Sequence, residues 1–316
     1  MEPNDKKEKR IFYAYLAVFL IIGAFIALAG YQYHRNFVKN YKANIEKQLS
    51  LIAGLKVGEL EYWLEEQRGD AETIFGNEVF SGLIKRYFKN PDDRDANREI
   101  QIWMQEFQSG FKYDAVFLTN TKLNRKIDIS NEPELPSSNI ALNDLDSLHS
   151  GKLVFNDFYW GNFKQKIFLK ILVPILDVHQ LIGIVELRID PKTYLYPILS
   201  NWPIPSETSE TLILRRDGNE AVYLNELRFQ KNSALNLRVP LQDTSLPAVR
   251  AVLGHEGYME GMGYRGKAVV AYVHKVPNSS WYLIAQTDES EVYTPLRKDI
   301  WLTLIFSLGL FLISGM

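Results

Sequence analysis

The chain has 316 residues, a formal net charge of −2 and no cysteine, and 46% of its residues are hydrophobic. A length of this order corresponds to about two domains. The lack of cysteine excludes disulfide frameworks, thiolate catalysis and cysteine-based metal sites. The near-neutral charge provides no general attraction to nucleic acids or to acidic lipids.

The first predicted element is a transmembrane helix over residues 11–30. This segment carries no charge and follows the basic sequence KKEKR at residues 6–10. About 20 apolar residues cross a bilayer core of roughly 30 Å. The segment is longer than the apolar part of a usual signal peptide and lacks an A-x-A-like cleavage site, so we expect an uncleaved anchor. The preceding basic residues place residues 1–10 in the cytoplasm and residue 31 onward outside it.

Residues 31–75 are predicted to form one long helix that continues out of the membrane. They contain no proline, and apolar residues recur at helical spacing while charges occupy the other faces. The recurring apolar residues are Val38, Tyr41, Ile45, Leu49, Ile52, Leu60 and Leu64. This narrow stripe suits a dimer seam, and it suits equally well the packing of the helix against its own domain.

A second helix, over residues 92–111, is followed by short strands rich in β-branched and aromatic residues. The predicted strands are residues 113–120, 125–130, 152–160, 165–176 and 181–190. A helical lead-in followed by an antiparallel sheet predicts an α+β module over residues 76–200.

The sequence NWPIPSET at residues 201–208 marks the start of a second, smaller α+β module over residues 201–296. In this module Asp217 and Gly218 form a hairpin-turn signal. A short helix over residues 245–254 is expected to end at Gly254, because glycine favours the position after a helix.

The last predicted element is a second transmembrane helix over residues 299–316. From Ile300 onward the run carries no charge and has no polar face, which disfavours a buried core helix. We expect it to return the chain to the cytoplasm, leaving residues 31–298 outside, and to continue beyond Met316. Arg297 and Lys298 on the outer side count mildly against this topology.

Two longer sequences of the chain resemble a known family. They are LRIDPKTYLYPILSNWPIPSETSETLILRRDGNEAVYLNELR and YRGKAVVAYVHKVPNSSWYLIAQTDESEVYTPLR. Both are similar to the double Cache sensor region of bacterial membrane-bound signalling proteins, notably those preceding PAS-linked histidine kinases and diguanylate cyclases. The resemblance covers roughly residues 57–296, and it departs at Gly263, where similar sequences usually have Asp. It implies a homodimeric, multi-pass protein of the bacterial inner membrane with two PAS-like (Cache) modules, of which the membrane-distal one binds a ligand.

No catalytic constellation is recognisable. The five histidines are scattered without metal-ligand spacing, and neither a phosphate-binding loop nor a G-x-S-x-G motif is present. We therefore expect no catalytic residue, metal or cofactor in this chain, and we expect any enzymatic output to lie beyond it. The basic residues are interspersed with acids, so we expect no nucleic-acid binding.

Seven residues of the distal module are predicted to bind a small molecule. In the sequence NDFYWG, Asp157 lies beside Tyr159 and Trp160, and a carboxylate next to aromatic rings suits a cationic or amine-bearing ligand. The alternative is that Asn156 and Asp157 form a turn while Trp160 packs in the core. The full predicted set is Tyr113, Asp114, Asp157, Tyr159, Trp160, Lys170 and Asp190.

Two of these residues have competing structural interpretations. Lys170 interrupts an apolar strand, but a lone lysine in a strand usually faces solvent. Asp190 is either a pocket acid or the N-cap of a helix that begins at Pro191. Amino-acid-binding members of the family carry an Arg-x-Trp pair upstream of the aromatic residue equivalent to Tyr159. Nothing in residues 137–155 matches that pair, so the sequence does not support an α-amino-acid ligand.

These observations favour the ligand-sensing region of a sensor histidine kinase. A diguanylate cyclase or a chemoreceptor with the same type of sensor is the first alternative. A membrane-anchored scaffold that binds a partner protein is the second, and an exported enzyme is the third.

Overall fold

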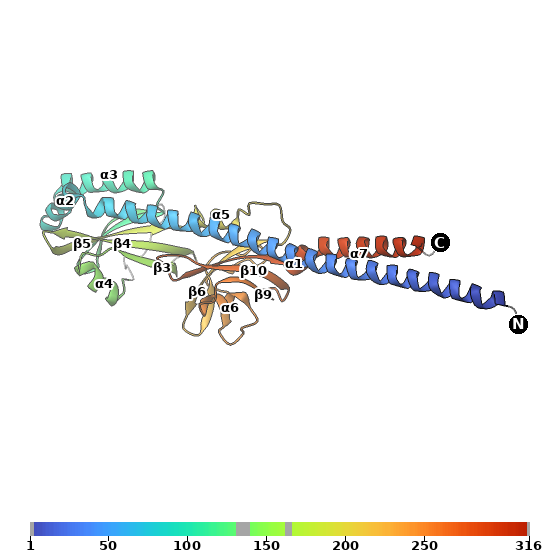
Figure 1. Cartoon of the computed structure of the whole chain (residues 1–316). Coiled ribbons are helices and arrows are strands. Elements are labelled where there is room, and N and C mark those ends of the chain that lie inside the picture. The colour runs from blue at the N-terminus through green and yellow to red at the C-terminus, as the bar shows by residue number, and fades with distance from the viewer. Residues whose placement is uncertain (1–2, 131–139, 162–165, 315–316) are drawn as a thin grey trace.

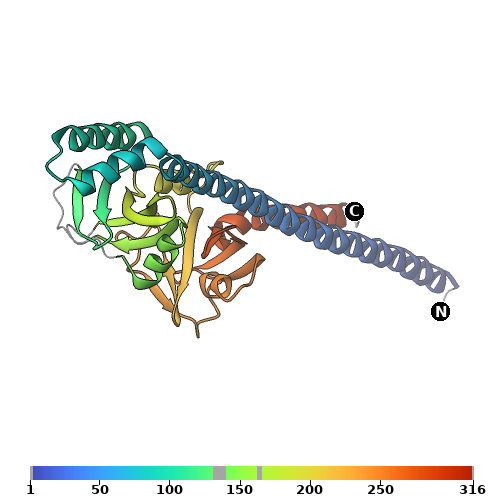
Figure 2. The ribbon, with the colours of Figure 1, turned by 90° about the vertical axis from the view of Figure 1, so that its left-hand side faces the viewer.

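The computed structural model describes residues 3–130, 140–161 and 166–314. Two α+β modules follow each other along one long helix, and both ends of the chain lie at the same end of the molecule (Figure 1). Figure 2 shows the same arrangement from the end opposite the chain termini. This architecture confirms the predicted fold class of a long helix followed by two antiparallel sheets.

The long helix α1 spans Pro3–Phe75 without interruption. Among the described residues, one helix, over Arg10–Phe75, is long and apolar enough to cross a membrane. Beyond the predicted membrane segment, the apolar stripe of α1 packs against the modules of its own chain: Leu49, Ile52 and Leu60 are buried in these contacts. The stripe is therefore covered within the chain, as the second of the two interpretations expected.

The distal module begins with α2 (Glu78–Lys89) and α3 (Arg94–Phe111), which turn back beside the end of α1 (Figure 1). The side chains of Asn77 and Asp93 cap these helices by accepting hydrogen bonds from the backbone amides of Phe80 and Ala96. Helix α2 is not among the predicted elements, although its apolar face is buried.

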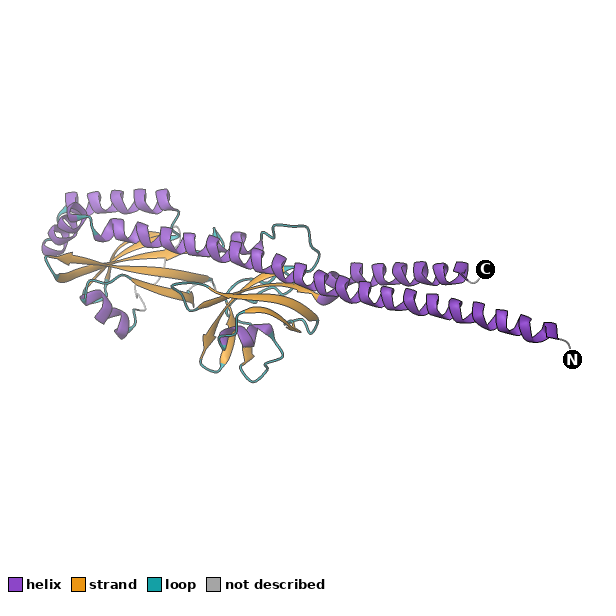
Figure 3. Cartoon of the chain, in the orientation of Figure 1, coloured by secondary structure: helices purple, strands orange, loops and turns teal. Residues whose placement is uncertain are grey.

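Five antiparallel strands form the distal sheet in the order β2-β1-β5-β4-β3. They are β1 (Ala115–Asn120), β2 (Arg125–Ser130), β3 (Val154–Trp160), β4 (Ile167–Asp177) and β5 (Gln180–Ile189). Helices α1, α2 and α3 cover one face of this sheet, and the short helix α4 (Leu142–His149) packs over part of the other (Figure 3).

Helix α5 (Leu195–Ser200) and a linker over residues 201–209 lead into the proximal module. Its sheet has the order β8-β7-β6-β11-β10-β9. The strands are β6 (Glu210–Asp217), β7 (Glu220–Tyr223), β8 (Arg238–Pro240), β9 (Gly257–Met262), β10 (Ala268–Lys275) and β11 (Trp281–Asp288), and helix α6 covers Pro247–Val252. The predicted hairpin turn is present, since Asp217 pairs with Glu220 and Gly218 has a φ of 59°.

Strand β11 continues directly into helix α7 (Glu289–Ser314). Helix α7 runs beside α1 towards the chain ends (Figure 3). The ring centroids of Phe19 and Phe311 are 4.6 Å apart, and Phe311 lies so close to Gly23 that a side chain there would collide with it. The second predicted transmembrane segment falls within α7, and its crossing of a membrane stays a prediction.

Candidate functional site

One face of the distal sheet is apolar, and the other combines a group of charges with an apolar cluster under α4. Lys170 on β4 is paired with Arg188 on β5, and Leu172 with Glu186, so that Lys170, Glu186 and Arg188 project from the same side. The other side carries apolar residues such as Leu169, which pack against the helices.

The three charges on this face are deeply buried. The exposed fractions are 5% for Lys170, 4% for Glu186 and 3% for Arg188. Buried charges are rare unless they are paired, and Nε and Nη2 of Arg188 both lie 2.6 Å from Oδ2 of Asp114. The edge strand β2 adds Arg125, whose Nη1 lies 3.5 Å from Oδ2 of Asp128.

Aromatic rings lie between these charges. The guanidinium of Arg188 is 4.4 Å from the ring centroid of Phe168, and Lys170 Nζ is 5.2 Å from that of Tyr159. The guanidinium of Arg125 lies 3.5 Å from the ring centroid of Phe117. Such cation–π contacts contribute about 0.5–2 kcal/mol each, most where water is excluded. We call this set the charged face: Asp114, Phe117, Arg125, Tyr159, Phe168, Lys170, Glu186 and Arg188.

The charged face contains three of the seven predicted site residues. Asp114 reaches it through Arg188, Tyr159 lines it, and Lys170 is buried in it instead of facing solvent. Arg188 and Glu186 are not among the predicted residues. They carry the same signal as Lys170, because two charges at alternate positions interrupt an apolar strand.

Three of the remaining predicted residues lie elsewhere. The hydroxyl of Tyr113 donates to Oδ2 of Asp70 at 3.1 Å, within the core between sheet and helices. Burial raises the pKa of Asp70, although this hydrogen bond opposes the shift.

Trp160 is 41% exposed at the end of β3 and does not pack in the core. Oδ1 of Asp190 accepts from the amide of Lys192 at 2.8 Å and so closes a turn; the helix that follows begins at Leu195, not at Pro191.

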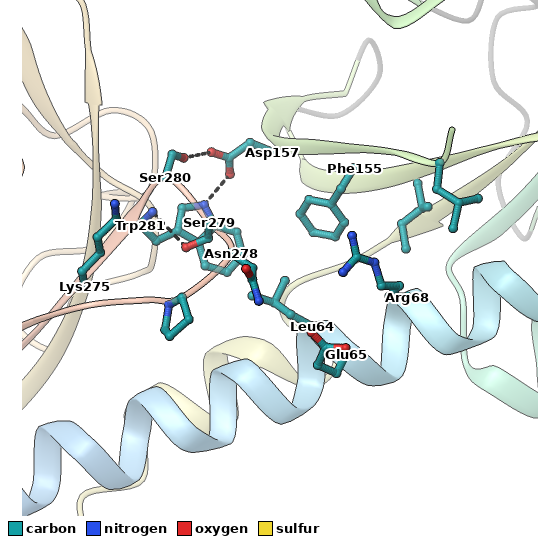
Figure 4. Close-up of a pocket in the computed structure, with 13 residues that line it drawn as sticks. Leu64, Glu65, Arg68, Phe155, Asp157, Lys275, Asn278, Ser279, Ser280 and Trp281 are labelled. Carbon is teal, nitrogen blue, oxygen red and sulfur yellow. Dashed lines mark hydrogen bonds between the residues drawn. The ribbon is translucent and has the colours of Figure 1, made fainter. Parts of the chain in front are cut away.

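The seventh residue, Asp157, points towards Ser280 and Trp281 of the proximal module (Figure 4). Its carboxylate accepts from Trp281 Nε1 at 2.9 Å and from Ser280 Oγ at 3.1 Å. Arg215 Nη1 lies 2.9 Å from Oδ2 of the same carboxylate. Asp157 therefore holds the two modules together, and its charge is neutralised within the chain.

A groove of about 650 Å³ adjoins this contact. Residues of α1, of β3 and of the turn between β10 and β11 line it, with Phe155 and Arg68 facing each other across the opening (Figure 4). Within the described part of the chain, no group of three or more His, Asp or Glu residues is placed to hold a metal ion.

Comparisons with known proteins agree with this architecture. No family model matches the sequence, and no curated protein matches it. Among solved structures, the chain is similar to the ligand-binding domain of the Pseudomonas fluorescens chemoreceptor CtaA in complex with L-isoleucine, with 12% identity and a TM-score of 0.55 over 81% of this chain and 97% of that one. It is also similar to the ligand-binding domain of the Pseudomonas aeruginosa amino acid chemoreceptor PctB in complex with L-Arg, with 14% identity and a TM-score of 0.53 over 80% and 98% of the two chains. The chain thus has the fold of chemoreceptor ligand-binding domains, which is the fold that its double Cache resemblance implied.

Proposed function

We propose that the chain is the extracytoplasmic ligand-sensing region of a bacterial membrane-bound receptor, and that its ligand binds at the charged face. The observation that carries this proposal is the burial of Lys170, Glu186 and Arg188 side by side on one face of the distal sheet. The fold shared with chemoreceptor ligand-binding domains supports it.

The energetics of this face favour a binding role over a purely structural one. Burying an ionised group costs several kcal/mol even when it is paired, and apolar residues in its place are often as stabilising or more so. The opposite face of the same sheet is packed with apolar residues, so apolar packing on this sheet is possible in this chain. Natural proteins bury charges against the usual pattern mainly at functional sites.

The charges of this face indicate the class of ligand. Arg188 and Lys170 suit an anionic group, while Glu186 and Asp114 suit a cationic one. We therefore propose a small molecule that carries both charges. Asp157 is not included, because its carboxylate lies at the junction with the proximal module, against Arg215 and Trp281. The L-isoleucine and L-Arg of the two similar complexes make amino acids suitable first probes, although the Arg-x-Trp pair of amino-acid-binding relatives is missing from the sequence.

The same architecture supports a proposal for the signal output. We propose that α7 is the second membrane crossing, that the receptor is a homodimer, and that a histidine kinase lies downstream. A diguanylate cyclase and a chemoreceptor remain alternatives, and the origin of the similar solved domains supports the chemoreceptor.

Thermal unfolding of the full chain in detergent, with each of the common amino acids and related diamines and dicarboxylates, tests the proposed site. We expect one of these compounds to raise the melting temperature of the wild type. Lys170→Met should reduce the affinity for that compound about tenfold or more, because it removes a charge-assisted contact. Lys126→Met is the matched control, since Lys126 is an exposed lysine of the same sheet. If no compound stabilises the wild type, or if Lys170→Met binds as tightly as the wild type, the proposed site is wrong.

A further inference from the structure

A second cavity, of about 780 Å³, lies where α5 and the linker meet the proximal module, and its lining includes no residue of the charged face. Its wall is built from the end of α5, the linker over residues 201–209, the start of β6 and the segment that follows β7. Ligand sites for small molecules have volumes of roughly 300–1,000 Å³ and combine apolar walls with a few polar groups. The size and composition of this cavity fall within that description.

Two residues that line the cavity each carry a buried polar group without a hydrogen-bond partner among the residues that the structure describes. They are the indole Nε1 of Trp202 and the hydroxyl of Thr211, a residue that is only 4% exposed. Such groups are rare in folded proteins. The neighbouring Asn225 shows the usual situation, because it accepts from the amide of Ile213 at 2.8 Å and donates to the carbonyl of Thr211 at 3.0 Å.

The charges of the wall restrict what can bind. Glu226 offsets the guanidinium of Arg228, and the carboxylate of Glu210 accepts hydrogen bonds from Tyr264 and Gln286, so the wall has no surplus positive charge to hold an anion. An indole N–H only donates and needs an acceptor oxygen, whereas a threonine hydroxyl both donates and accepts. The apolar part of the wall includes the Trp202 ring, which offers a flat surface to carbon-bound hydrogens.

We propose that this cavity is a second ligand site, which takes a small uncharged molecule bearing several hydroxyl groups, such as a polyol or a monosaccharide. Trp202 and Thr211 supply its hydrogen bonds, and the Trp202 ring supplies its apolar contact.

Hydrogen bonds also join the linker that lines the cavity to helix α7. Glu291, in the first turn of α7, accepts from Ser206 Oγ at 2.7 Å and from the amide of Thr208 at 2.8 Å, and the Thr208 hydroxyl donates to it as well. These hydrogen bonds hold the pKa of Glu291 below its usual value, despite the opposing effect of burial. Because Ser206 also lines the cavity, a bound molecule contacts the segment that is anchored to α7.

The test uses glycerol, ribose and glucose as probes of the full chain in detergent, with succinate as an anionic control. Binding is followed by saturation-transfer NMR and by thermal unfolding. Polyols stabilise folded proteins without binding, by exclusion from their surface. The thermal readout is therefore the difference between the wild type and Thr211→Val, which replaces the unpartnered hydroxyl by a methyl group.

We expect Thr211→Val without a probe to melt about 2 °C above the wild type, because it removes an unpaired buried group. With the bound probe, the wild type should gain more than the variant, and the saturation-transfer signal should fall at least fivefold in Thr211→Val. Trp202→Phe should lose the signal similarly, which covers the case in which the first variant folds poorly. Thr244→Val, at an exposed threonine of the same module, is the matched control and should keep the signal.

Equal responses of wild type and Thr211→Val to all three probes would overturn the proposal, as would a specific response to succinate alone. Lys170→Met should leave the signal unchanged. The outcome is therefore independent of whether a ligand binds at the charged face.

Discussion

Asp157 joins the two modules, and the structure gives an expected cost for its removal. In Asp157→Ala, the indole N–H of Trp281, a residue only 1% exposed, loses its acceptor. An unsatisfied buried donor costs about 1–3 kcal/mol. The ion pair with Arg215 adds up to about 1 kcal/mol, because both side chains are partly exposed. We therefore expect the free energy of unfolding to fall by about 1–4 kcal/mol.

A double-mutant cycle isolates the contact between the modules. Asp157→Ala, Trp281→Phe and the double variant are compared with the wild type by urea unfolding of the full chain in detergent, followed by circular dichroism. Groups in one hydrogen-bond network give interaction energies of about 0.5–3 kcal/mol. We expect a value of about 1–2 kcal/mol for this pair, because the hydrogen bond is charge-assisted and one partner is buried.

The control for this cycle is Asp146→Ala, at an exposed carboxylate of the same module. It should change the free energy of unfolding by no more than about 0.5 kcal/mol. If the effects of Asp157→Ala and Trp281→Phe add within about 0.3 kcal/mol, the carboxylate does not bind the indole in solution, and the assignment of Asp157 to the module junction is wrong.

Two further substitutions test the buried polar groups. Asp70→Asn is expected to raise the melting temperature near pH 7 and to do so less near pH 4. Burial raises the pKa of Asp70, so wild-type stability falls as the pH rises from about 4 through that pKa, whereas Asn keeps the acceptor for Tyr113. Thermal melts across this pH range measure the difference, and a gain that does not depend on pH contradicts the explanation. Asn225→Ala should lower the free energy of unfolding by about 2–4 kcal/mol in urea titrations, because it leaves buried backbone groups of β6 without their partners; a loss below about 1 kcal/mol contradicts it.

The sequence was sufficient to predict the elements whose signals are local. The helical periodicity of residues 31–75, the proline-rich linker and the Asp217-Gly218 turn each depend on neighbouring residues alone. Which side chains share the charged face depends instead on strand register, since a shift of one residue moves a side chain to the other face. Lys170 was identifiable as an anomaly, but its neighbours Arg188 and Glu186 become apparent only when β4 and β5 are paired.

The sequence NDFYWG shows this limit most clearly. Its polar and aromatic residues were expected to line one site because they are adjacent in sequence. In the structure, the pairing of β3 with β4 is irregular between Asn156 and Tyr159. A bulge of this kind changes the direction of the side chains along a strand. Tyr159 therefore lies against Lys170 on the charged face, while Asp157 points to the proximal module.

The irregular strand β3 connects the charged face of the distal module with helix α7 through few residues. On one side β3 contributes Tyr159 to the charged face, and on the other its Asp157 binds Trp281, the first residue of β11. Strand β11 then runs without a break into α7. A ligand can shift β3 only if it binds one arrangement of this strand more tightly than another. Tyr159, on the face proposed to bind the ligand, and Asp157, which joins the modules, are thus two positions apart in one strand. A displacement of β3 at one of these positions would therefore also move the other.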